Sequence, residues 1–294
     1  MGYVGRFAPS PTGPLHLGSL VAALGSFLDA RRHRGRWLLR IEDLDTARVR
    51  PGCADEIKRT LETLGLAWDG PIEYQSRRLS LYEDALRDLA RRGLTFDCYC
   101  KRRSRTDGED GRCTGTCRDQ PAGSGPAAVR FRVCETESVS FVDRFQGPCS
   151  FAMRELGNVV IRRRDQVVAY QLAVVVDDAE QAVTDIVRGA DLLPSTAWQL
   201  LLQRALDLPG PRYAHLPVVV EPDGAKLAKS RRSVPVDPLA GGRPLVEALN
   251  LLRQSPPSEL WGEPPQTVLS WAIQHWDPAT LERVQKATAP IMMP

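Results

Sequence analysis

The sequence predicts an α/β fold in which a parallel sheet carries an inserted module and a short helical tail. Short apolar runs alternate with amphipathic stretches from residue 3 onward, which is the rhythm of βαβ units. Residues 98–126 are rich in Cys, Arg, Asp and Gly and poor in aliphatic side chains, so we expect them to form a module outside the sheet core. Helical patterns separated by Pro-rich turns begin near residue 239. With 294 residues, the chain is long enough to bury a core without disulfides.

The first part of the chain predicts a βαβ unit. A short strand over 3–8 precedes a Pro/Gly turn over 9–14. A helix then follows, because apolar residues recur at helical spacing at Leu17, Leu20, Val21, Leu24, Phe27 and Leu28. A second strand is predicted over Trp37–Ile41, and helices are predicted near 54–65 and 78–92.

The second part of the chain predicts shorter strands and another α/β stretch. In chain order, the expected elements are strands at 128–133 and 139–146, then an α/β stretch over 159–220 with a strand at Asp185–Arg188, a helix over 192–206 and a strand at 216–220. From about residue 239 the tail is expected to form a few helices, which the Pro-rich turns Pro256-Pro257 and Pro264-Pro265 separate.

The sequence predicts no membrane helix. The longest apolar run, Val167–Val176, is shorter than the roughly 18 residues that a membrane helix needs, and Gln171 interrupts it. The N-terminus lacks the charged, apolar and cleavage regions of a signal peptide, so we expect a cytoplasmic protein.

The basic residues are unevenly distributed, although the net charge is only +3. Of the 39 basic residues only five are lysines, and two of these, Lys226 and Lys229, lie within four positions. The arginine-rich clusters lie at 31–36, 101–103, 162–164 and 231–232. Such clusters permit a polyanionic partner, but each also fits an ordinary solvated face.

A strand, a rigid turn and a helix meet in the segment PSPTGPLHLGS at 9–19. This arrangement directs free backbone N–H groups and the positive end of the helix dipole toward one place, which suits an anion. His16 can donate to a phosphate, and Gly18 lets a nucleotide lie close to the backbone. An ordinary strand–turn–helix with a capping histidine gives the same pattern.

The segment KLAKS at 226–230 follows the turn Asp223-Gly224. Two lysines on a Gly-containing loop can neutralise a pyrophosphate leaving group. A solvated basic loop is the alternative for so short a match.

Together, the two segments resemble the HIGH and KMSKS signatures of class I aminoacyl-tRNA synthetases, in their order, their separation and the α/β pattern between them. Further segments are similar to the glutamyl/glutaminyl branch: GRFAPSPTG at 5–13, RIED at 40–43, AYQLA at 169–173, VDD at 176–178 and RGADLL at 188–193. The resemblance covers residues 3 to about 235.

Two positions depart from the family pattern. Ser19 stands where HIGH ends in histidine, and Ala228 stands where KMSKS has a serine. A hydroxyl at Ser19 can still bond a phosphate oxygen, and Lys229 is retained, so we expect activity to survive.

The resemblance implies a Rossmann-like catalytic domain that activates L-glutamate with ATP. Glutamate carries two carboxylates and one ammonium, so its site needs paired cations, preferably arginines, and an anion. The implied glutamate-binding residues are Arg6, Phe7, Ala8, Pro9, Ser10, Glu42, Tyr170 and Arg188. Glu42 is implied to take the α-ammonium, and which arginine faces which carboxylate stays open.

Each pocket residue also has an ordinary structural interpretation. Glu42 could pair with Arg40 or Arg48 at the surface. Arg188 could form a salt bridge to Asp185 or Asp191, and Tyr170 could simply pack in the core.

The implied ATP-binding residues are His16, Gly18, Ser19, Lys226 and Lys229. His16 and Lys229 would be the catalytic pair that steadies the phosphates, with Mg²⁺ shared between them. The α-carboxylate of glutamate would attack the α-phosphate and release pyrophosphate, so positioning and charge stabilisation would supply the catalysis.

Four of the seven cysteines form two close pairs, Cys98-x-Cys100 and Cys113-x₃-Cys117. Four thiolates in this arrangement suit one structural zinc ion per chain. A pair of disulfides is the alternative, which a cytosolic chain rarely keeps. A similar zinc-bearing insertion occurs in the glutamyl branch, so the resemblance favours zinc.

The expected division of the chain follows from these motifs. The parts are the first half of the catalytic domain at 1–95, an inserted acceptor-type zinc module at 96–158, the second half with the KMSKS-like loop at 159–238, and a short helical C-terminal region at 239–294. Only 64 residues follow Ser230, which we expect to be too few for the anticodon-binding region of full-length glutamyl-tRNA synthetases.

Within the branch, HLGSLVAALGS at 16–26 is most similar to the truncated paralogues, the glutamyl-queuosine tRNA(Asp) synthetases. These activate glutamate without tRNA and esterify it to queuosine at the wobble position of tRNA(Asp). The resemblance therefore implies an anticodon stem-loop carrying queuosine as the partner of a monomeric enzyme. A short glutamyl-tRNA synthetase that charges a 3′ end and an inactive tRNA-binding paralogue are the alternatives.

Overall fold

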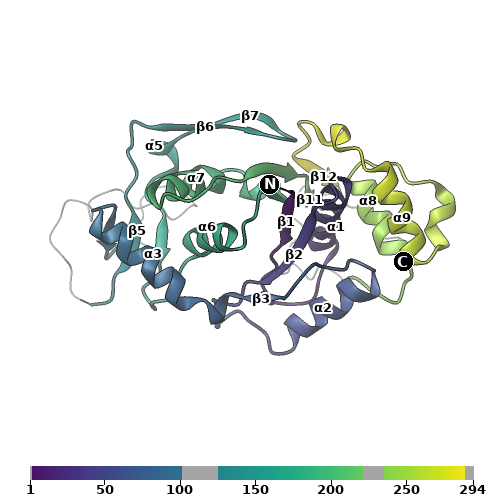
Figure 1. The fold of residues 1–294 in the computed structure, drawn as a ribbon, viewed down its shortest axis with the longest axis horizontal. Helices are drawn as coiled ribbons and strands as arrows, with labels where there is room; N and C mark the ends of the chain where they lie inside the picture. The colour runs from purple at the N-terminus through teal and green to yellow at the C-terminus, as the bar shows by residue number, and fades with distance from the viewer. Residues whose placement is uncertain (1, 101–124, 221–234, 289–294) are drawn as a thin grey trace.

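The computed structural model describes residues 2–100, 125–220 and 235–288, and a parallel sheet lies at its centre (Figure 1). Strand β1 (Val4–Phe7) pairs in parallel with β2 (Arg36–Ile41), and β2 pairs with the short β3 (Glu73–Tyr74). Helix α1 (Leu17–Arg32) makes the crossover from β1 to β2. The register places Phe7 opposite Leu39, so apolar side chains of both strands enter the same core.

The second half of the chain extends this sheet on the other side of β1. Strands β9 (Asp185–Gly189) and β10 (Arg212–Leu216) pair in parallel. The backbone N–H of Thr184, just before β9, donates to the carbonyl of Val4 at 2.9 Å and holds β9 beside β1. The two ladders, β3-β2-β1 and β9-β10, therefore lie side by side, with β1 next to β9.

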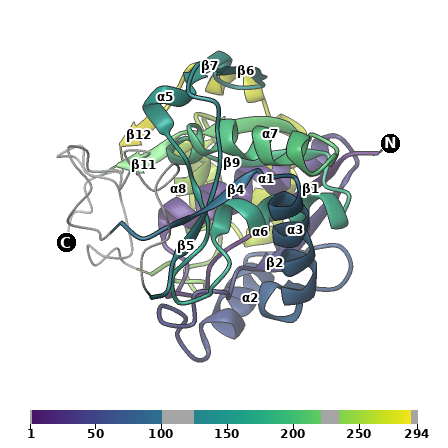
Figure 2. The ribbon, with the colours of Figure 1, turned by 90° about the vertical axis from the view of Figure 1, so that its left-hand side faces the viewer.

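A three-stranded antiparallel sheet forms from β4 (Thr95–Cys98), β5 (Ala128–Phe131) and β8 (Val160–Arg162). A separate hairpin, β6 (Ser138–Asp143) with β7 (Gly147–Ala152), lies along the edge of the molecule that is at the top of Figure 2. Both structures lie between the two halves of the parallel sheet in sequence, as expected for an insertion.

The other helices before residue 206 pack beside these strands. They are α2 (Cys53–Thr63), the 3₁₀ turn Gln75–Arg77, α3 (Leu79–Arg91), α5 (Met153–Leu156), α6 (Tyr170–Glu180), the 3₁₀ turn Ala190–Leu192 and α7 (Ser195–Ala205). Among them, α3, α6 and α7 contact β4, β8 and β6 respectively. Helices α3, α6 and α7 share a core in which Tyr82, Leu172 and Leu202 are fully buried.

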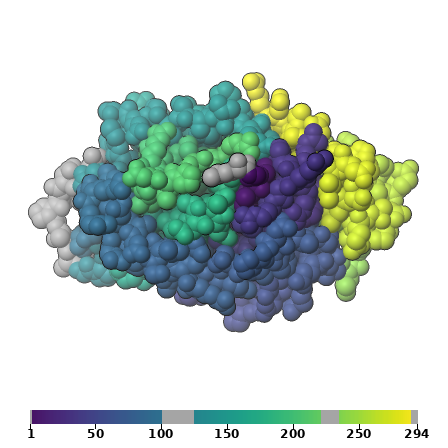
Figure 3. Space-filling model, in the orientation of Figure 1, coloured from purple at the N-terminus to yellow at the C-terminus, as the bar shows by residue number. Residues whose placement is uncertain are grey.

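The C-terminal residues pack against α1 rather than forming a separate body (Figures 1 and 3). Trp276 and Trp37 are both fully buried in this larger core. The tail elements are α8 (Arg243–Leu251), α9 (Pro265–His275), 3₁₀ turns at Ser258–Gly262 and Pro278–Leu281, and strand β12 (Lys286–Thr288), which pairs with β11 (Val218–Val220).

The structure corrects three sequence-based boundaries. The strand expected at 139–146 is the first arm of the β6–β7 hairpin, and its turn begins at Arg144. The helix expected at 192–206 begins only at Ser195, because a 3₁₀ turn and Pro194 precede it. The strand expected at 216–220 is interrupted at Pro217, which lacks the N–H that a continuous ladder needs, so β10 ends and β11 begins there.

Helix α6 was not predicted because it has no polar face. Residues 172–178 are all buried, so the periodicity that marks an amphipathic helix is missing. No helix in the described ranges is long and apolar enough to span a membrane.

Candidate active site

The residues expected to bind glutamate lie at the carboxyl ends of the parallel strands. Arg6 is on β1, Glu42 directly follows β2, and Arg188 lies one residue before the end of β9. In an open α/β sheet, ligands bind at this edge, where the strand order reverses. Here the reversal is at β1, with β2 on one side and β9 on the other. Arg188 Nη1 lies 3.4 Å from the Tyr170 hydroxyl, and the charges of Arg188, Glu42 and Arg6 all influence the pKa of Tyr170, so the four residues lie near one another.

The turn after β1 forms one wall of this site. The carbonyl of Pro9 accepts the backbone N–H of Glu42 at 3.0 Å, which fixes Glu42 beside the turn. Ser10 is exposed and Ala8 is half-buried. The side chain of Phe7 stacks on Trp37 in the core, so only its backbone can face a ligand.

His16 caps the N-terminus of α1. Its Nδ1 accepts the backbone N–H of Ser19 at 3.2 Å, and its Nε2 lies 3.0 Å from the Ser19 hydroxyl. The first turn of α1, which includes Gly18, carries no acidic residue, so the positive end of the helix dipole keeps its attraction for an anion.

The chain returns to this helix N-terminus after residue 234. Pro235 forms a bridge with His16, and the N–H of Val236 donates to the carbonyl of Leu15 at 2.8 Å. Lys226 and Lys229 lie outside the described residues. Pro235, the first described residue after them, lies beside His16.

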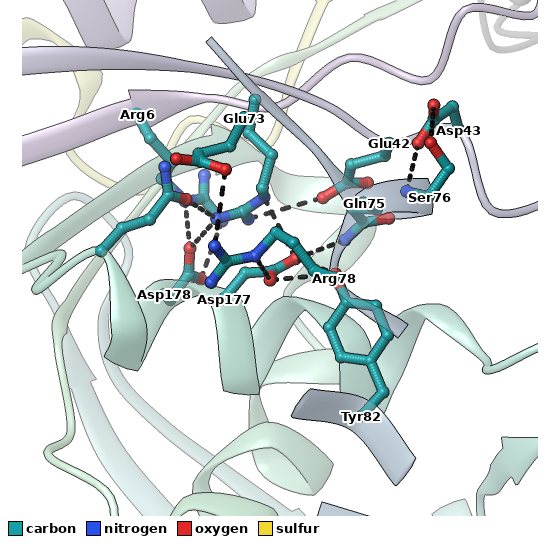
Figure 4. Close-up of polar contacts among 12 residues, drawn as sticks. Arg6, Glu42, Asp43, Glu73, Gln75, Ser76, Arg78, Tyr82, Asp177 and Asp178 are labelled. Atoms are coloured by element: carbon teal, nitrogen blue, oxygen red, sulfur yellow. Dashed lines mark hydrogen bonds and ion pairs between the residues drawn. The ribbon is translucent and has the colours of Figure 1, made fainter. Parts of the chain in front are cut away.

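A buried ion cluster supports the floor of the site (Figure 4). The carboxylate of Asp178 on α6 accepts from Arg6 Nε at 3.1 Å and from Arg40 Nη1 at 2.9 Å. Burial raises the pKa of Asp178, but the charges of Arg6 and Arg40 outweigh it and hold that pKa below its usual range. Asp178 therefore fixes Arg6 and neutralises much of its charge.

The neighbouring Asp177 anchors the cluster to the start of α3. Its carboxylate accepts from Arg78 Nε at 2.7 Å, from the hydroxyl of Tyr82 at 2.9 Å and from the amide of Gln75 at 2.8 Å. Figure 4 shows these three side chains converging on Asp177. Asp177 and Asp178, from the second half of the chain, therefore hold side chains from the first half in place at the site.

Glu42 is a buried anion whose hydrogen bonding is incomplete. Its side chain is 8% exposed, and it forms an ion pair with Arg40, one of its expected partners, at 3.5 Å between Nη2 and Oε1. In the described ranges Oε1 nevertheless accepts no hydrogen bond. Burial raises the pKa of Glu42 to about 7, against the lowering effect of Arg40 and Arg6. A cation that donates hydrogen bonds stabilises a buried carboxylate of this kind in its ionised form.

Arg188 is the uncompensated cation of the site. Its side chain is 5% exposed. Nε donates to His215 Nε2 at 3.1 Å, Nη2 donates to the Thr196 hydroxyl at 2.8 Å, and Nη1 lies 3.4 Å from the Tyr170 hydroxyl. Among the described residues no carboxylate lies within ion-pair distance of Arg188. Asp185, one of its expected partners, instead pairs with Arg212 at 2.8 Å.

Comparison with known proteins identifies the family. The family described as class I tRNA synthetases (E and Q), catalytic domain, matches residues 3–240. The chain is 51% identical to the glutamyl-Q tRNA(Asp) synthetase of Ectopseudomonas mendocina over 96% of its length and 95% of the relative's. It is 50% identical to the protein of that name from Aromatoleum aromaticum, over 98% of this chain and 93% of the relative. This chain belongs to the glutamyl-Q tRNA(Asp) synthetase family, within the class I tRNA synthetases.

The fold comparison agrees. The structure matches that of the glutamate-tRNA synthetase of Elizabethkingia anophelis with a TM-score of 0.79 and 23% identity. The match covers 99% of this chain and 68% of that chain. The class I synthetase fold with its parallel sheet is therefore confirmed.

Several contacts of this synthetase site carry no recognisable local signal in the sequence. Asp177 and Asp178 lie in the family-like segment VDD at 176–178, but their partners lie about 100 or more positions away. His215 and Asp143 contact each other across 72 positions, and no local pattern marks either of them. Only the folded chain shows these pairings.

The cysteine module is only partly within the described chain. Cys98 is buried at the end of β4, and Cys100 packs beside it and Phe96. Cys113 and Cys117 lie outside the described residues. In the described ranges no group of three or more Cys, His, Asp or Glu could hold a metal ion, so the zinc site stays a prediction.

The basic clusters are partly neutralised within the synthetase. Arg31 pairs with Asp69 at 2.7 Å, and Arg163 pairs with Asp45 at 2.8 Å. Arg164 donates to the carbonyl of Cys100 at 2.8 Å. These arginines serve internal contacts, so the surface they offer to RNA is smaller than the sequence alone indicates.

Proposed function

We propose that this chain activates L-glutamate with ATP to glutamyl-adenylate without tRNA and transfers the glutamate to queuosine at the wobble position of tRNA(Asp). One observation carries the first half of the proposal. Within the described chain, the buried guanidinium of Arg188 has no carboxylate within ion-pair distance, and Oε1 of the buried Glu42 accepts no hydrogen bond, and both lie near Tyr170. A zwitterionic amino acid with a second carboxylate supplies an anion for Arg188 and an ammonium donor for Glu42.

In this mechanism the protein binds and orients glutamate rather than attacking it. Arg188 binds a carboxylate, Glu42 receives the α-ammonium, and Tyr170 closes the site beside Arg188. Arg6, held in place by Asp178, lines the site where the α-carboxylate approaches the α-phosphate of ATP. A carboxylate oxygen then forms the bond to that phosphorus as pyrophosphate leaves. Catalysis comes from positioning and electrostatic stabilisation.

The ATP phosphates would lie at the N-terminus of α1. His16, Gly18 and Ser19 would bind them from the helix, and Lys226 and Lys229 from the KMSKS-like segment. Mg²⁺ would accompany ATP and share its phosphate charge. The bridge between His16 and Pro235 supports this arrangement, because Pro235, five positions after Ser230 in the sequence, lies beside the N-terminus of this helix.

The acceptor half of the proposal rests on the relatives, which are named for tRNA(Asp) and share about half of the residues along nearly the whole chain. The queuosine base would have to enter the site unstacked from its neighbours. The basic residues that stay exposed would hold the anticodon stem-loop through its phosphates, and the enzyme would act as a monomer.

The direct test has two parts. Glutamate-dependent exchange of pyrophosphate into ATP is expected without any tRNA. Labelled glutamate is then expected on the anticodon loop of tRNA(Asp) and absent from tRNA(Asp) that lacks queuosine.

Two outcomes would contradict the proposal. Exchange that requires tRNA, with label on the 3′ adenosine, would identify a short glutamyl-tRNA synthetase. RNA binding without exchange or transfer would identify an inactive paralogue.

The raised pKa of Glu42 predicts a pH dependence of glutamate binding. The ammonium needs ionised Glu42, whose pKa is about 7 in the unliganded site. Below that pH a proton must be lost before binding, so the KM for glutamate is expected to rise by up to about tenfold for each unit of falling pH. Above about pH 8 it should be constant. Steady-state exchange assays between pH 5.5 and 8.5 measure this.

The control is Glu42→Gln, which binds glutamate weakly but has no carboxyl to titrate. Its KM for glutamate should lack this slope. An unchanged slope in Glu42→Gln would assign the pH dependence to another group.

We also propose that Cys98, Cys100, Cys113 and Cys117 bind one structural zinc ion. The contact between Cys98 and Cys100 supports this, because two thiolates already lie together and a tetrahedral site needs two more. Metal analysis without chelators should find one zinc per chain, and Cys98→Ser should lose it. Cys134→Ser, which removes an exposed cysteine, should keep it. Less than about half an equivalent in the unmodified protein would contradict a closed four-cysteine site.

A further inference from the structure

Arg188 is held from behind by a second layer of buried polar groups. Its Nε edge meets His215 Nε2 at 3.1 Å, and its Nη2 meets Thr196 at 2.8 Å and the carbonyl of Leu192 at 3.4 Å. These contacts occupy one side of the planar guanidinium. The Nη1 group beside Tyr170 is left facing the site, so the contacts behind Arg188 decide the direction in which it presents its charge.

The contact between Arg188 and His215 is possible in only one tautomer of the imidazole. Arginine has donors only, so His215 Nε2 must be the unprotonated acceptor. The single proton of the neutral ring is therefore on Nδ1. That nitrogen lies 2.6 Å from Oδ2 of Asp143, which accepts a hydrogen bond from it.

Asp143 is itself fixed at the end of β6. Its Oδ1 accepts the backbone N–H groups of Phe145 at 3.0 Å, Gln146 at 2.9 Å and His215 at 3.1 Å. With Oδ2 on the imidazole, both carboxylate oxygens are used. Asp143 is 1% exposed and His215 is fully buried, so water does not compete for these bonds.

We propose that Asp143 and His215 form a positioning pair that fixes the tautomer and orientation needed for Arg188 to bind a carboxylate of glutamate. This inference rests on the proposed function, since it assigns a task to Arg188 in glutamate binding. It also gives the β6–β7 hairpin a role in the site, because the hairpin supplies the first member of the chain Asp143–His215–Arg188.

The charges around His215 agree with a neutral ring. Burial lowers the pKa of His215, the Asp143 hydrogen bond raises it, and the Arg188 charge lowers it again, for a net lowering. Asp191, which precedes α7, adds a smaller raising effect, and the Tyr213 ring stacks on the imidazole at 6.3 Å. Protonation of His215 at Nε2 would place its N–H against the N–H of Arg188. The contact with Arg188 therefore requires the neutral imidazole.

Asp143→Asn tests the tautomer without removing volume. The amide oxygen can keep the three backbone N–H bonds, which directs the NH₂ group at His215 Nδ1. The imidazole proton then moves to Nε2 and faces the Arg188 N–H. We expect the KM for glutamate in pyrophosphate exchange to rise about 10- to 100-fold, the range for losing a hydrogen bond to a charged group, while the KM for ATP stays within about twofold.

His215→Gln and His215→Leu form a second, matched pair. Glutamine can offer an amide oxygen to Arg188 Nε, whereas leucine offers nothing, so His215→Gln should recover part of the glutamate affinity that His215→Leu loses. Ser140→Ala is the control in the same hairpin, because it removes only the exposed contact between the hydroxyls of Ser140 and Ser150. It should leave both KM values unchanged. Thermal unfolding of each variant shows that the compared proteins are folded.

The outcomes separate the two proposals. If the unmodified chain shows glutamate-dependent exchange but Asp143→Asn and both His215 variants keep its KM for glutamate, the positioning pair is wrong and the proposed function stands. Equal changes in the KM for glutamate and for ATP would likewise overturn the pair, because they indicate a general structural effect. An unmodified chain without glutamate-dependent exchange would overturn both.

Discussion

Arg188→Leu is expected to lower kcat/KM for glutamate in pyrophosphate exchange by about 10³-fold or more. Arg188 is 5% exposed, and no carboxylate among the described residues neutralises its charge before a substrate binds. Removing one partner of a buried, hydrogen-bonded charge pair costs roughly 2–5 kcal/mol, and each 1.4 kcal/mol is tenfold. The upper part of that range applies because leucine would leave a substrate carboxylate buried without its cation.

Arg188→Lys separates charge from geometry. Lysine keeps the charge but cannot donate to His215, Thr196 and a carboxylate from one rigid plane. We expect an activity between those of the unmodified chain and Arg188→Leu. Arg204→Leu, on α7 and 61% exposed, is the matched control and should keep full activity.

A binding measurement distinguishes lost recognition from lost folding. Glutamate should raise the Tm of the unmodified chain, with the logarithm of its concentration above Kd, and this rise should vanish in Arg188→Leu. If Arg188→Leu kept the glutamate-dependent rise in Tm, Arg188 would not be the carboxylate site.

Arg6 is paired with a carboxylate, whereas Arg188 has none among the described residues, and the sequence alone does not show this difference. Both were expected in the pocket because both lie in recognisable motifs, and the structure brings both to the carboxyl ends of the sheet strands. The sequence gives no sign that Arg6 is already paired with Asp178, because that contact spans 172 positions. Local spacing predicts which residues reach a site, whereas the charge left for a substrate depends on partners from distant elements.

The same distinction explains the errors in the predicted elements. Strand, turn and helix near His16 were correctly expected, since Pro and Gly mark the turn and apolar spacing marks the helix. Helix α6 was missed because a helix buried on all sides has no periodic pattern. The β6–β7 turn was missed although Gly147, with φ of 77°, supplies the left-handed residue after it. Asp143 precedes that turn, so missing the hairpin also hid its link to the site.

Asp178→Ala is expected to reduce the free energy of unfolding by about 3–5 kcal/mol, the cost of breaking a buried ion pair by removing one partner. Arg6 and Arg40 are 4% and 0% exposed, and both donate to Asp178. Without that carboxylate their charges face each other in a site that excludes water. Asp177 cannot replace it, since it lies 3.7 Å from Arg40 and is already bonded to Arg78 and Tyr82.

The control is Asp207→Ala, which breaks an ion pair of similar length in water. Asp207 is 75% exposed and accepts from Arg92 at 2.9 Å. An exposed pair contributes at most about 1 kcal/mol, so Asp207→Ala should leave the denaturation midpoint nearly unchanged. Urea denaturation of the three proteins at pH 7 measures both changes.

The lowered pKa of Asp178 makes the stability difference between the unmodified chain and Asp178→Ala depend on pH. Because the folded-state pKa lies below the unfolded value of about 3.9, the stabilisation is fully present above that pH and is lost as pH falls further. The difference in unfolding free energy between the unmodified chain and Asp178→Ala should therefore be constant from pH 7 to about pH 5 and shrink below about pH 4. A constant difference down to pH 3 would mean that packing, rather than the negative charge, accounts for the loss. Asp178→Asn, which keeps the shape without the charge, would then be nearly as stable as the unmodified chain.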